Sequence, residues 1–385
     1  MVPRNALTRL SPGTLARRLA GIGLGLAGWG AYRFLSDRPD LASAVAGAGP
    51  IPALTRGLSI LTATVPLPLA EAVVVAVVLR QAVGAGRGVI RIRAGHDRIL
   101  PTLGRGTLRI AQDAGVLVFL FYLLWGVQYT RPGLEEHLAI EPAGDARTPE
   151  LRALAEHAVR RTNEAYGELH GSADIGEPTP PREVGHIVPS LETGWEKVGD
   201  LLDLPGEVAK PYGAPKEILA TPLVKRLGIS GIYFPYTAEA LVLNDLPGVL
   251  LGKELGHEMA HQRGFSSESD ANVLGTLVAL HAPDPYLRYN GYAFLQRQLV
   301  PALQRVSTSE AEAVLAARAP GVRRDLAALA RYWQPARTPV AVAASRVNNA
   351  MLRTHGIEEG VANYRGSTWA FVAIARELGL EAVFP

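Results

Sequence analysis

A short stretch in the second half of the chain, Lys253 to Asn272, contains the pattern His-Glu-x-x-His. Residues four positions apart lie on one face of an α-helix, so the pattern predicts a helix that directs His257 and His261 at one metal ion. Glu258, next to the first histidine, is placed to take a proton from a water molecule beside that ion. Because the pattern is short, the alternative is a surface helix that carries two histidines by chance.

A catalytic zinc site needs a third protein ligand and an open position for water. A metzincin would have a third histidine three residues after Gly264, but that position is Ser267. Glu268 follows directly, and Asp270 is the other acidic candidate. The two side chains project about 200° apart around a helix, so they are not expected to bind the same ion. The alternative for Glu268 is an ordinary acid in the first turn of a helix, where the helix dipole favours it.

Composition restricts the class of protein around this site. Of the 385 residues 48% are hydrophobic, the net charge is +3 and the pI is about 9.1. The basic residues lie beside apolar runs and are not collected on one recognition helix, which favours a membrane over nucleic acid as a partner. The absence of cysteine excludes disulfides, thiolate zinc sites and cysteine nucleophiles.

Three apolar segments predict a membrane anchor in residues 1–130, with transmembrane helices at about 19–35, 58–79 and 108–129. The first segment is rich in glycine, which membrane helices tolerate, and a cleaved signal peptide is the alternative for it. The second contains Glu71, which is a functional acid inside the span, or part of a helix–helix contact, or a residue near the membrane interface.

Arginine distribution predicts the orientation of this anchor. Residues 1–18 carry four arginines and no acid, and residues 80–107, expected as a basic loop, carry six arginines and one aspartate. Both segments are therefore expected on the cytoplasmic side. Everything after Tyr129 then lies outside the cytoplasm, as a zincin-like domain over residues 131–385.

The chain is expected to be mainly α-helical, with one small exception in residues 131–385. Residues 229–244 have the composition of strands with a proline break, and predict a small β-hairpin or edge strand just before the His-Glu-x-x-His helix. An edge strand there can bind an extended peptide by main-chain pairing, and a purely structural hairpin is the alternative. Residues 171–215, rich in glycine and proline, predict mostly loop, and residues 215–227 predict a short helix.

Five motifs together resemble those of a known family. They are Trp125–Arg131, Gly231–Asn244, His257–Asn272, Arg288–Tyr292 and Gly360–Tyr364. The chain resembles the uncharacterised bacterial membrane family catalogued as domain of unknown function 3810, and its His-Glu-x-x-His…Glu-x-x-Ala-Asn pattern is similar to that of gluzincin peptidases.

The resemblance implies roles for two more residues. Glu268 corresponds to the third zinc ligand, and Asn272 to a residue that orients a ligand histidine by a hydrogen bond. It also implies a multi-pass protein of the bacterial inner membrane that binds one Zn²⁺ per chain. It does not imply a substrate.

Four further residues are candidate substrate or oxyanion contacts, because zincins often give this task to Tyr, His or Arg. They are Glu239, Arg288, Tyr289 and Tyr292, with His281 as a related candidate. Each has a structural role as its alternative.

These observations favour a membrane-anchored zinc-dependent peptidase that uses Glu258 as general base and has the lipid bilayer and a peptide or protein as partners. One alternative is a zinc amidase or other hydrolase of cell-envelope substrates. Another is a catalytically silent membrane sensor or scaffold, although a structural zinc site would need a fourth protein ligand. An intramembrane protease is disfavoured because Lys253, Glu254, Gln262 and Arg263 make the helix too polar for lipid.

Overall fold

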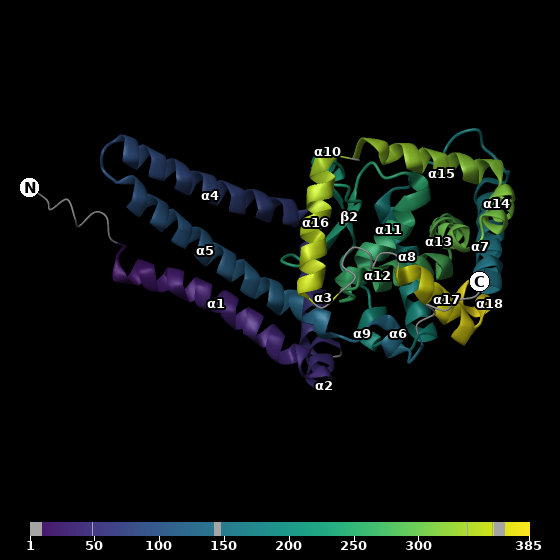
Figure 1. The fold of residues 1–385 in the computed structure, drawn as a ribbon, viewed down its shortest axis with the longest axis horizontal. Coiled ribbons are helices and arrows are strands. Elements are labelled where there is room, and N and C mark those ends of the chain that lie inside the picture. Colours follow the sequence, from purple (N-terminus) through teal and green to yellow (C-terminus); the bar gives the residue numbers. More distant parts are fainter. Residues whose placement is uncertain (1–9, 48, 142–147, 337, 356, 358–365) are drawn as a thin grey trace, which may run out of the picture.

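The computed structural model of the chain describes residues 10–47, 49–141, 148–336, 338–355, 357 and 366–385. Over these residues the protein is mainly α-helical with one small sheet. Three long helices, α1 (Pro12–Ser36), α4 (Leu69–Arg93) and α5 (Ile99–Leu124), form an arm that projects from a globular body (Figure 1).

Glycines bring two helices of the arm into close contact. Gly21, Gly25 and Gly28 are buried on one face of α1, which packs along α5. A β-carbon at Gly25 would lie 2.8 Å from the Cα of Gly115 on α5, and one at Gly115 would lie 2.3 Å from the carbonyl oxygen of Gly21. Only small residues permit such an approach of two helix backbones, a packing mode typical of membrane helices.

Two described helices, α4 and α5, are long and apolar enough to span a membrane, with mean hydropathies of 1.6 and 1.5. The prediction of three such helices is therefore corrected. The segment at 19–35 lies within α1, where the glycines that permit close packing also dilute the apolar content. The segment at 58–79 is divided between α3 (Pro50–Ala63) and α4, because Pro66 and Pro68 interrupt the helix.

The predicted third span and basic loop also change. Residues 108–124 lie within α5, but the chain continues as a 3₁₀ helix, η2 (Gly126–Thr130). The expected loop 80–107 is helical at both ends, since α4 continues to Arg93 and α5 begins at Ile99. Between α1 and α3 lie the short α2 (Pro39–Ala42) and the π-helix η1 (Ser43–Gly47).

The body is built around α11 (Gly248–Gln262), whose fifteen residues are all buried. α12 (Glu268–His281) and α13 (Pro285–Val306) pack on it, and α7 (Thr148–His170) packs on α13. The outer helices are α6 (Leu134–His137), α8 (Val184–Leu201), α9 (Gly206–Ala209), α14 (Thr308–Ala316), α15 (Pro320–Tyr332), η3 (Gln334–Ala336), α16 (Pro339–Thr354), α17 (Gly366–Leu378) and α18 (Leu380–Val383).

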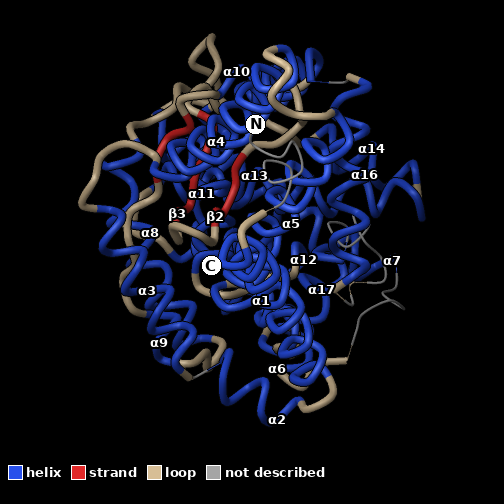
Figure 2. Tube along the Cα trace, turned by 90° about the vertical axis from the view of Figure 1, so that its left-hand side faces the viewer, coloured by secondary structure: helices blue, strands red, loops and turns tan. Residues whose placement is uncertain are grey.

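The sheet has three strands in the order β1 (Lys216–Ile218), β3 (Glu239–Leu243), β2 (Gly231–Phe234), with β1 parallel and β2 antiparallel to β3. The predicted hairpin before α11 is confirmed as β2–β3, with β2 at the edge, and the sheet lies beside α11 (Figure 2). Two local predictions are wrong. Residues 215–227 form β1 and the short α10 (Thr221–Lys225), and the expected loop 171–215 contains the 18-residue helix α8.

Candidate metal centre

The predicted two-helix element is present. His257 and His261 lie one turn apart near the end of α11, which is followed by Gly264 with φ of +92°. The Ser267 side chain caps α12 by accepting a hydrogen bond from the backbone N–H of Asp270, and Glu268 is the first residue of α12. The left-handed conformation at Gly264 costs glycine little, and it lets the chain reverse within a few residues.

A glycine pair brings α11 and α12 together at the metal centre. A β-carbon at Gly256 would lie 2.8 Å from the carbonyl oxygen of Gly275, and one at Gly275 would lie 2.5 Å from the backbone nitrogen of His257. The helices therefore touch through their backbones one residue before the first histidine. This contact fixes the distance at which Glu268 faces the two imidazoles.

Three side chains converge on one point. Nε2 of His257 lies 3.2 Å, and Nε2 of His261 lies 3.5 Å, from the same carboxylate oxygen, Oε2 of Glu268. Ligand atoms of the three residues all lie within 4.8 Å of one another. Bonds of about 2.0–2.2 Å to a tetrahedral zinc ion separate its ligand atoms by about 3.3–3.6 Å, so the three groups can hold one ion with small adjustments.

The donor set itself fits a catalytic zinc ion. Oε2 of Glu268 is buried and accepts no well-formed hydrogen bond from the described residues, although two imidazole nitrogens face it. A buried acceptor opposite two bases is costly unless a cation lies between them. Over the described ranges no fourth His, Cys, Asp or Glu joins the group. Two nitrogens and one carboxylate with an open fourth position are typical of catalytic zinc.

Glu258 lies beside these groups in contact with the edge strand. It is buried, and a β-carbon at Gly231 of β2 would lie 2.5 Å from its Oε1. Its carboxylate makes no hydrogen bond or ion pair with the residues that the structure describes. Burial raises the pKa of Glu258 to about 8. The group is therefore uncommitted and able to exchange a proton near neutral pH.

The charges of the three predicted ligands depend on one another. Burial raises the pKa of Glu268. The neighbouring imidazoles lower it by more than burial raises it, so the pKa of Glu268 lies below its ordinary value. Burial likewise lowers the pKa of His261, but the carboxylates of Glu268 and Glu258 raise it to about 9. Burial and the Lys253 ammonium lower the pKa of His257. Because ligands bind a metal in their deprotonated form, binding of a cation here would compete with protonation of His261.

The second ring nitrogens of the two histidines are in different environments. Nδ1 of His261 lies 2.7 Å from the carbonyl oxygen of Phe265, a contact that orients a ligand imidazole. The His261 ring also contacts Trp125, the residue directly after α5, with 5.8 Å between the ring centroids and the ring planes nearly perpendicular. Nδ1 of His257 is buried and finds no hydrogen-bond partner among the described residues.

The role expected for Asn272 needs correction. Its side-chain oxygen accepts a hydrogen bond from Nζ of Lys253, at 2.7 Å, and not from a ligand histidine. Lys253 is buried one turn before His257, lies 4.0 Å from the centre of the Phe294 ring, and pairs with Glu254 at 3.6 Å. The sequence analysis did not identify this buried cation, because it used Lys253 only as a sign that the helix is too polar for lipid.

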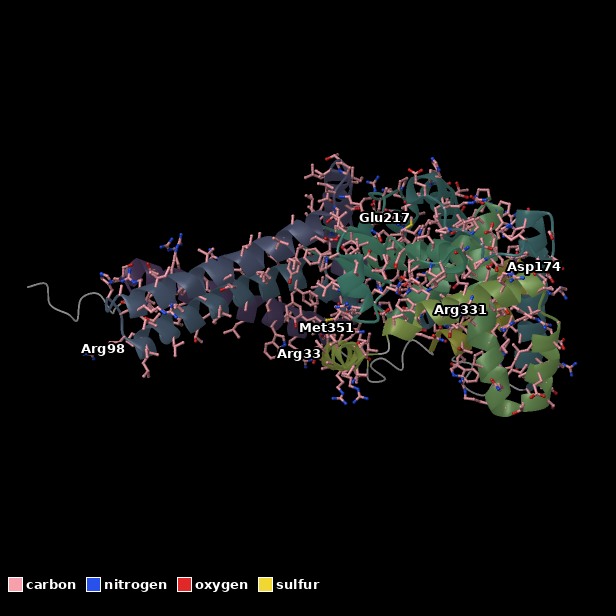
Figure 3. The ribbon with its side chains drawn as sticks, turned by 90° about the horizontal axis from the view of Figure 1, so that it is seen from above. Arg33, Arg98, Asp174, Glu217, Arg331 and Met351 are labelled. Atoms are coloured by element: carbon pink, nitrogen blue, oxygen red, sulfur yellow. The ribbon has the colours of Figure 1, made fainter. Side chains whose placement is uncertain are left out.

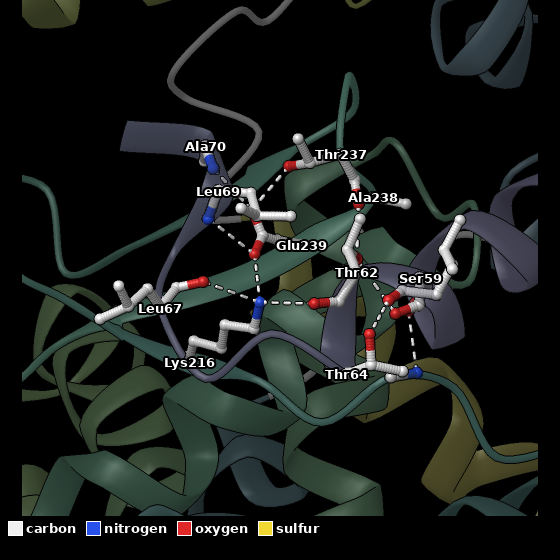
Figure 4. A network of polar contacts seen from close by, with 12 residues as sticks. Ser59, Thr62, Thr64, Leu67, Leu69, Ala70, Lys216, Thr237, Ala238 and Glu239 are labelled. Carbon is white, nitrogen blue, oxygen red and sulfur yellow. Dashed lines mark hydrogen bonds and ion pairs between the residues drawn. The ribbon is translucent and has the colours of Figure 1, made fainter. Parts of the chain in front are cut away.

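Glu239 braces the fold and is not available to a substrate (Figure 4). It is buried on β3 and pairs with Lys216 of β1 at 2.5 Å. It also accepts hydrogen bonds from the backbone N–H groups of Leu69 and Ala70, at 3.0 and 2.6 Å, and from the Thr237 hydroxyl at 2.7 Å. The first turn of α4 offers unpaired N–H groups and a positive dipole end, so this carboxylate ties the arm to the sheet.

The other candidate substrate contacts also serve the fold. The Arg288 guanidinium binds Glu168 and the carbonyl oxygens of Ala282 and Pro283. The Tyr289 hydroxyl donates to Asp325 at 2.5 Å. The remaining two residues hold the C-terminal segment. The Tyr292 hydroxyl donates a hydrogen bond to the carbonyl oxygen of Pro385, and Nε2 of His281 lies 3.2 Å from the carbonyl oxygen of Val383. The structure brings none of these polar groups to the metal centre.

Asp270, the rival ligand, faces away from the centre. Its carboxylate accepts a hydrogen bond from the backbone N–H of Leu134 at 3.1 Å. It lines a cavity of about 250 Å³ together with Tyr129, Arg131 and His355. The angular argument against Asp270 as a ligand is therefore confirmed.

Residues 49–368 match the family described as protein of unknown function, DUF3810. The chain belongs to this family. The matched region includes α4, α5 and the three converging side chains, whereas α1 precedes it. The motif Gly360–Tyr364 lies outside the described residues. No curated protein and no solved structure matches the chain.

Proposed function

We propose that the protein is a membrane-anchored, zinc-dependent peptidase. One observation carries the proposal: two imidazoles and a carboxylate converge on one point, and a second, uncommitted carboxylate lies next to them. The two carboxylates have separate tasks, since Glu268 faces both imidazoles and Glu258 faces the edge strand. This division into a ligand set and a free base is what hydrolysis by an activated water requires.

The protein groups would share the reaction as follows. His257, His261 and Glu268 hold the ion, which when bound makes water more acidic and polarises the substrate carbonyl. Glu258 takes the proton of the attacking water and passes it to the nitrogen of the departing amine. Its pKa, raised to about 8 by burial, is lowered again by a nearby cation, so that it can accept and release a proton at neutral pH.

The edge strand supports a peptide as the substrate. β2 pairs with β3 on one side and with no described strand on the other. Gly231 of β2 touches Glu258, so an extended peptide that pairs with β2 would pass beside the general base. A zinc amidase of the cell envelope would use the same water chemistry, but it would give the unpaired edge of β2 no part in substrate binding.

The anchor consists of the two candidate spans, α4 and α5, with α1 packed against α5. The arginines at the start of α1, the end of α4 and the start of α5 all lie toward the tip of the arm, far from the body (Figure 1). By the positive-inside rule the tip is cytoplasmic, and the body with the metal centre is extracytoplasmic. α11 lies inside this body, which disfavours an intramembrane protease.

The test uses the full-length protein in lipid nanodiscs. We expect one zinc ion per chain by elemental analysis, and cleavage of members of a peptide library. Glu258→Gln should keep the zinc and lose cleavage, whereas Glu217→Gln, which changes an exposed acid on β1, should keep both. Absence of stoichiometric zinc in the unaltered protein would refute the proposal. Equal cleavage by Glu258→Gln would remove Glu258 as the base, and zinc without any cleavage would favour a silent sensor or scaffold.

A further inference from the structure

We propose that α10 and α16 form a second membrane contact, a rim of the body that rests in the interface of the bilayer crossed by the arm. The rim consists of Leu219, α10 and α16. This inference rests on the proposed membrane anchoring, and it adds a lipid-binding surface on the body itself.

The exposed apolar side chains of the body are concentrated on this rim. Among the described residues after position 130, six of the seven exposed large apolar side chains belong to it, and the seventh is Val306 at the end of α13. The six are Leu219, Leu223, Val340, Val342, Val347 and Met351. Exposed apolar patches on one side of a soluble domain mark a surface that binds an apolar partner.

Contacts at both ends hold α16 across the base of the arm. At its start, the Thr338 hydroxyl donates to the carbonyl oxygen of Arg226, just after α10. After its end, Nε2 of His355 lies 3.3 Å from the Tyr122 hydroxyl of α5, and the His355 ring lies 5.4 Å from that of Tyr32 in α1. α16 is thereby fixed between the body and two helices of the arm.

The orientation of α16 suits a helix that lies in a membrane surface. It lies crosswise to the arm in Figure 1, and in Figure 3, which views the molecule from above, it is seen end-on. If the arm runs along the membrane normal, α16 runs in the membrane plane. Interfacial helices adopt this orientation, with their apolar face about 5–10 Å below the boundary of headgroups and acyl chains.

The pattern of side chains on α16 also suits lipid. Val340, Val347 and Met351 follow at spacings of seven and four, and form one exposed stripe. Arg346 and Arg353 are exposed as well, and α16 has no acidic residue. Basic residues beside an apolar stripe fit the anionic headgroups and acyl chains of a bilayer surface, whereas charges of both signs would be expected on a solvated face.

The length of the arm places the bilayer surface at this level. α4 has 25 residues and α5 has 26, only slightly more than the roughly 20 that a helix needs to cross the hydrocarbon core. The base of the arm must therefore lie close to the membrane surface. Glu71, in the first turn of α4, accepts a hydrogen bond from the backbone N–H of Leu219 at 2.6 Å, so the rim begins where the span begins. This contact also gives Glu71 a structural role.

The absence of cysteine permits a direct test by single-cysteine labelling. An environment-sensitive fluorophore is attached at Val347→Cys on the rim, at Val78→Cys on the lipid-facing side of α4, and at Val306→Cys as the matched exposed valine elsewhere on the body. Each full-length variant is reconstituted at one protein per nanodisc that contains lipids with a nitroxide quencher near the headgroup or deep in the acyl chain.

We expect the headgroup-proximal nitroxide to quench the probe at 347, the deep nitroxide to quench the probe at 78, and neither to quench the probe at 306. If the probe at 78 is quenched but that at 347 is not, the rim proposal is wrong and the anchor stands. If no probe is quenched, the anchor and with it the rim are refuted. A blue shift at 347 without quenching would mean that protein, such as a second copy, covers the rim, and would also overturn the proposal.

Discussion

The side chain of Glu258 lies against Gly231, so that a β-carbon at position 231 would sit 2.5 Å from Oε1 and 2.7 Å from Cγ of Glu258. The edge strand and the proposed general base are therefore in direct contact. No larger residue fits at position 231 unless the carboxylate moves. This contact couples the place where an extended peptide would pair to the group that would move the proton.

Gly231→Ala should therefore displace Glu258 without touching the metal ligands. We expect peptide cleavage to fall about 10²-fold, the usual cost of misplacing a catalytic group by roughly 1 Å, while zinc content stays at one per chain. Gly185→Ala is the control, because a β-carbon there meets no atom within 4 Å. Unchanged cleavage by Gly231→Ala would show that Glu258 does not need its present position.

Gly275→Ala should instead disrupt the metal centre itself. Its β-carbon would meet the backbone of Gly256 and His257, which cannot move without separating α11 from α12. We expect a loss of about 1–3 kcal/mol or more in the free energy of unfolding, the cost of overpacking, together with weaker zinc binding. Chemical unfolding and zinc titration measure the two effects. Gly167→Ala in α7, which has open space at the same position, should show neither.

A pair of neighbouring acids tests the ligand assignment. Glu268→Gln should weaken zinc binding by at least about 10–100-fold, the range seen when even an outer partner of a ligand is lost. Asp270→Asn should retain zinc, because its carboxylate binds the Leu134 N–H outside the centre. Competition with a chelator of known affinity gives both values. Equal zinc affinities for the two variants would contradict the three-ligand centre.

The candidate centre could be predicted because its signals are local. His257, His261 and Glu268 lie within twelve positions of one another, and helix periodicity together with one turn brings them close. The β2–β3 hairpin was predictable for the same reason. The helix α8 was missed because its glycines and Pro189 resemble a loop, although Gly194 is required where α8 packs on the backbone of Val278.

Roles that depend on distant partners could not be predicted. Glu239 looked like a residue for substrate, but its carboxylate caps α4, about 170 positions earlier in the chain. Lys253 indicated only that α11 is too polar for lipid, but its side chain is buried and contacts Asn272 and the Phe294 ring. Whether a charged side chain meets water or a buried partner depends on tertiary packing, which neither periodicity nor composition contains.

The contact between Lys253 and Asn272 gives a prediction that separates two roles. Asn272→Ala leaves a buried ammonium short of an acceptor, so the free energy of unfolding should fall by about 1–3 kcal/mol while zinc affinity changes little. The double variant Lys253→Met with Asn272→Leu removes both partners and should recover much of the loss. The opposite result, weak zinc binding with unchanged stability, would restore Asn272 as the residue that orients a ligand histidine.

Acid should release the C-terminus through His157. Nδ1 of this buried ring accepts from Arg160, and Nε2 donates to the carbonyl oxygen of Phe384 at 3.0 Å, so the neutral form is fully bonded. Burial lowers the pKa of His157 from 6.5. The hydrogen bond to Phe384 and the Glu381 charge oppose this shift, and the Arg160 and Arg161 charges add to it. Since the unfolded state then binds the proton more tightly, stability is present above pH 6.5 and is lost as pH falls below it. His157→Gln should make the stability less dependent on pH. Thermal unfolding between pH 5 and 8 and proteolysis of the C-terminus measure this dependence. If the variant loses stability in acid as steeply as the unaltered protein, other groups cause the effect.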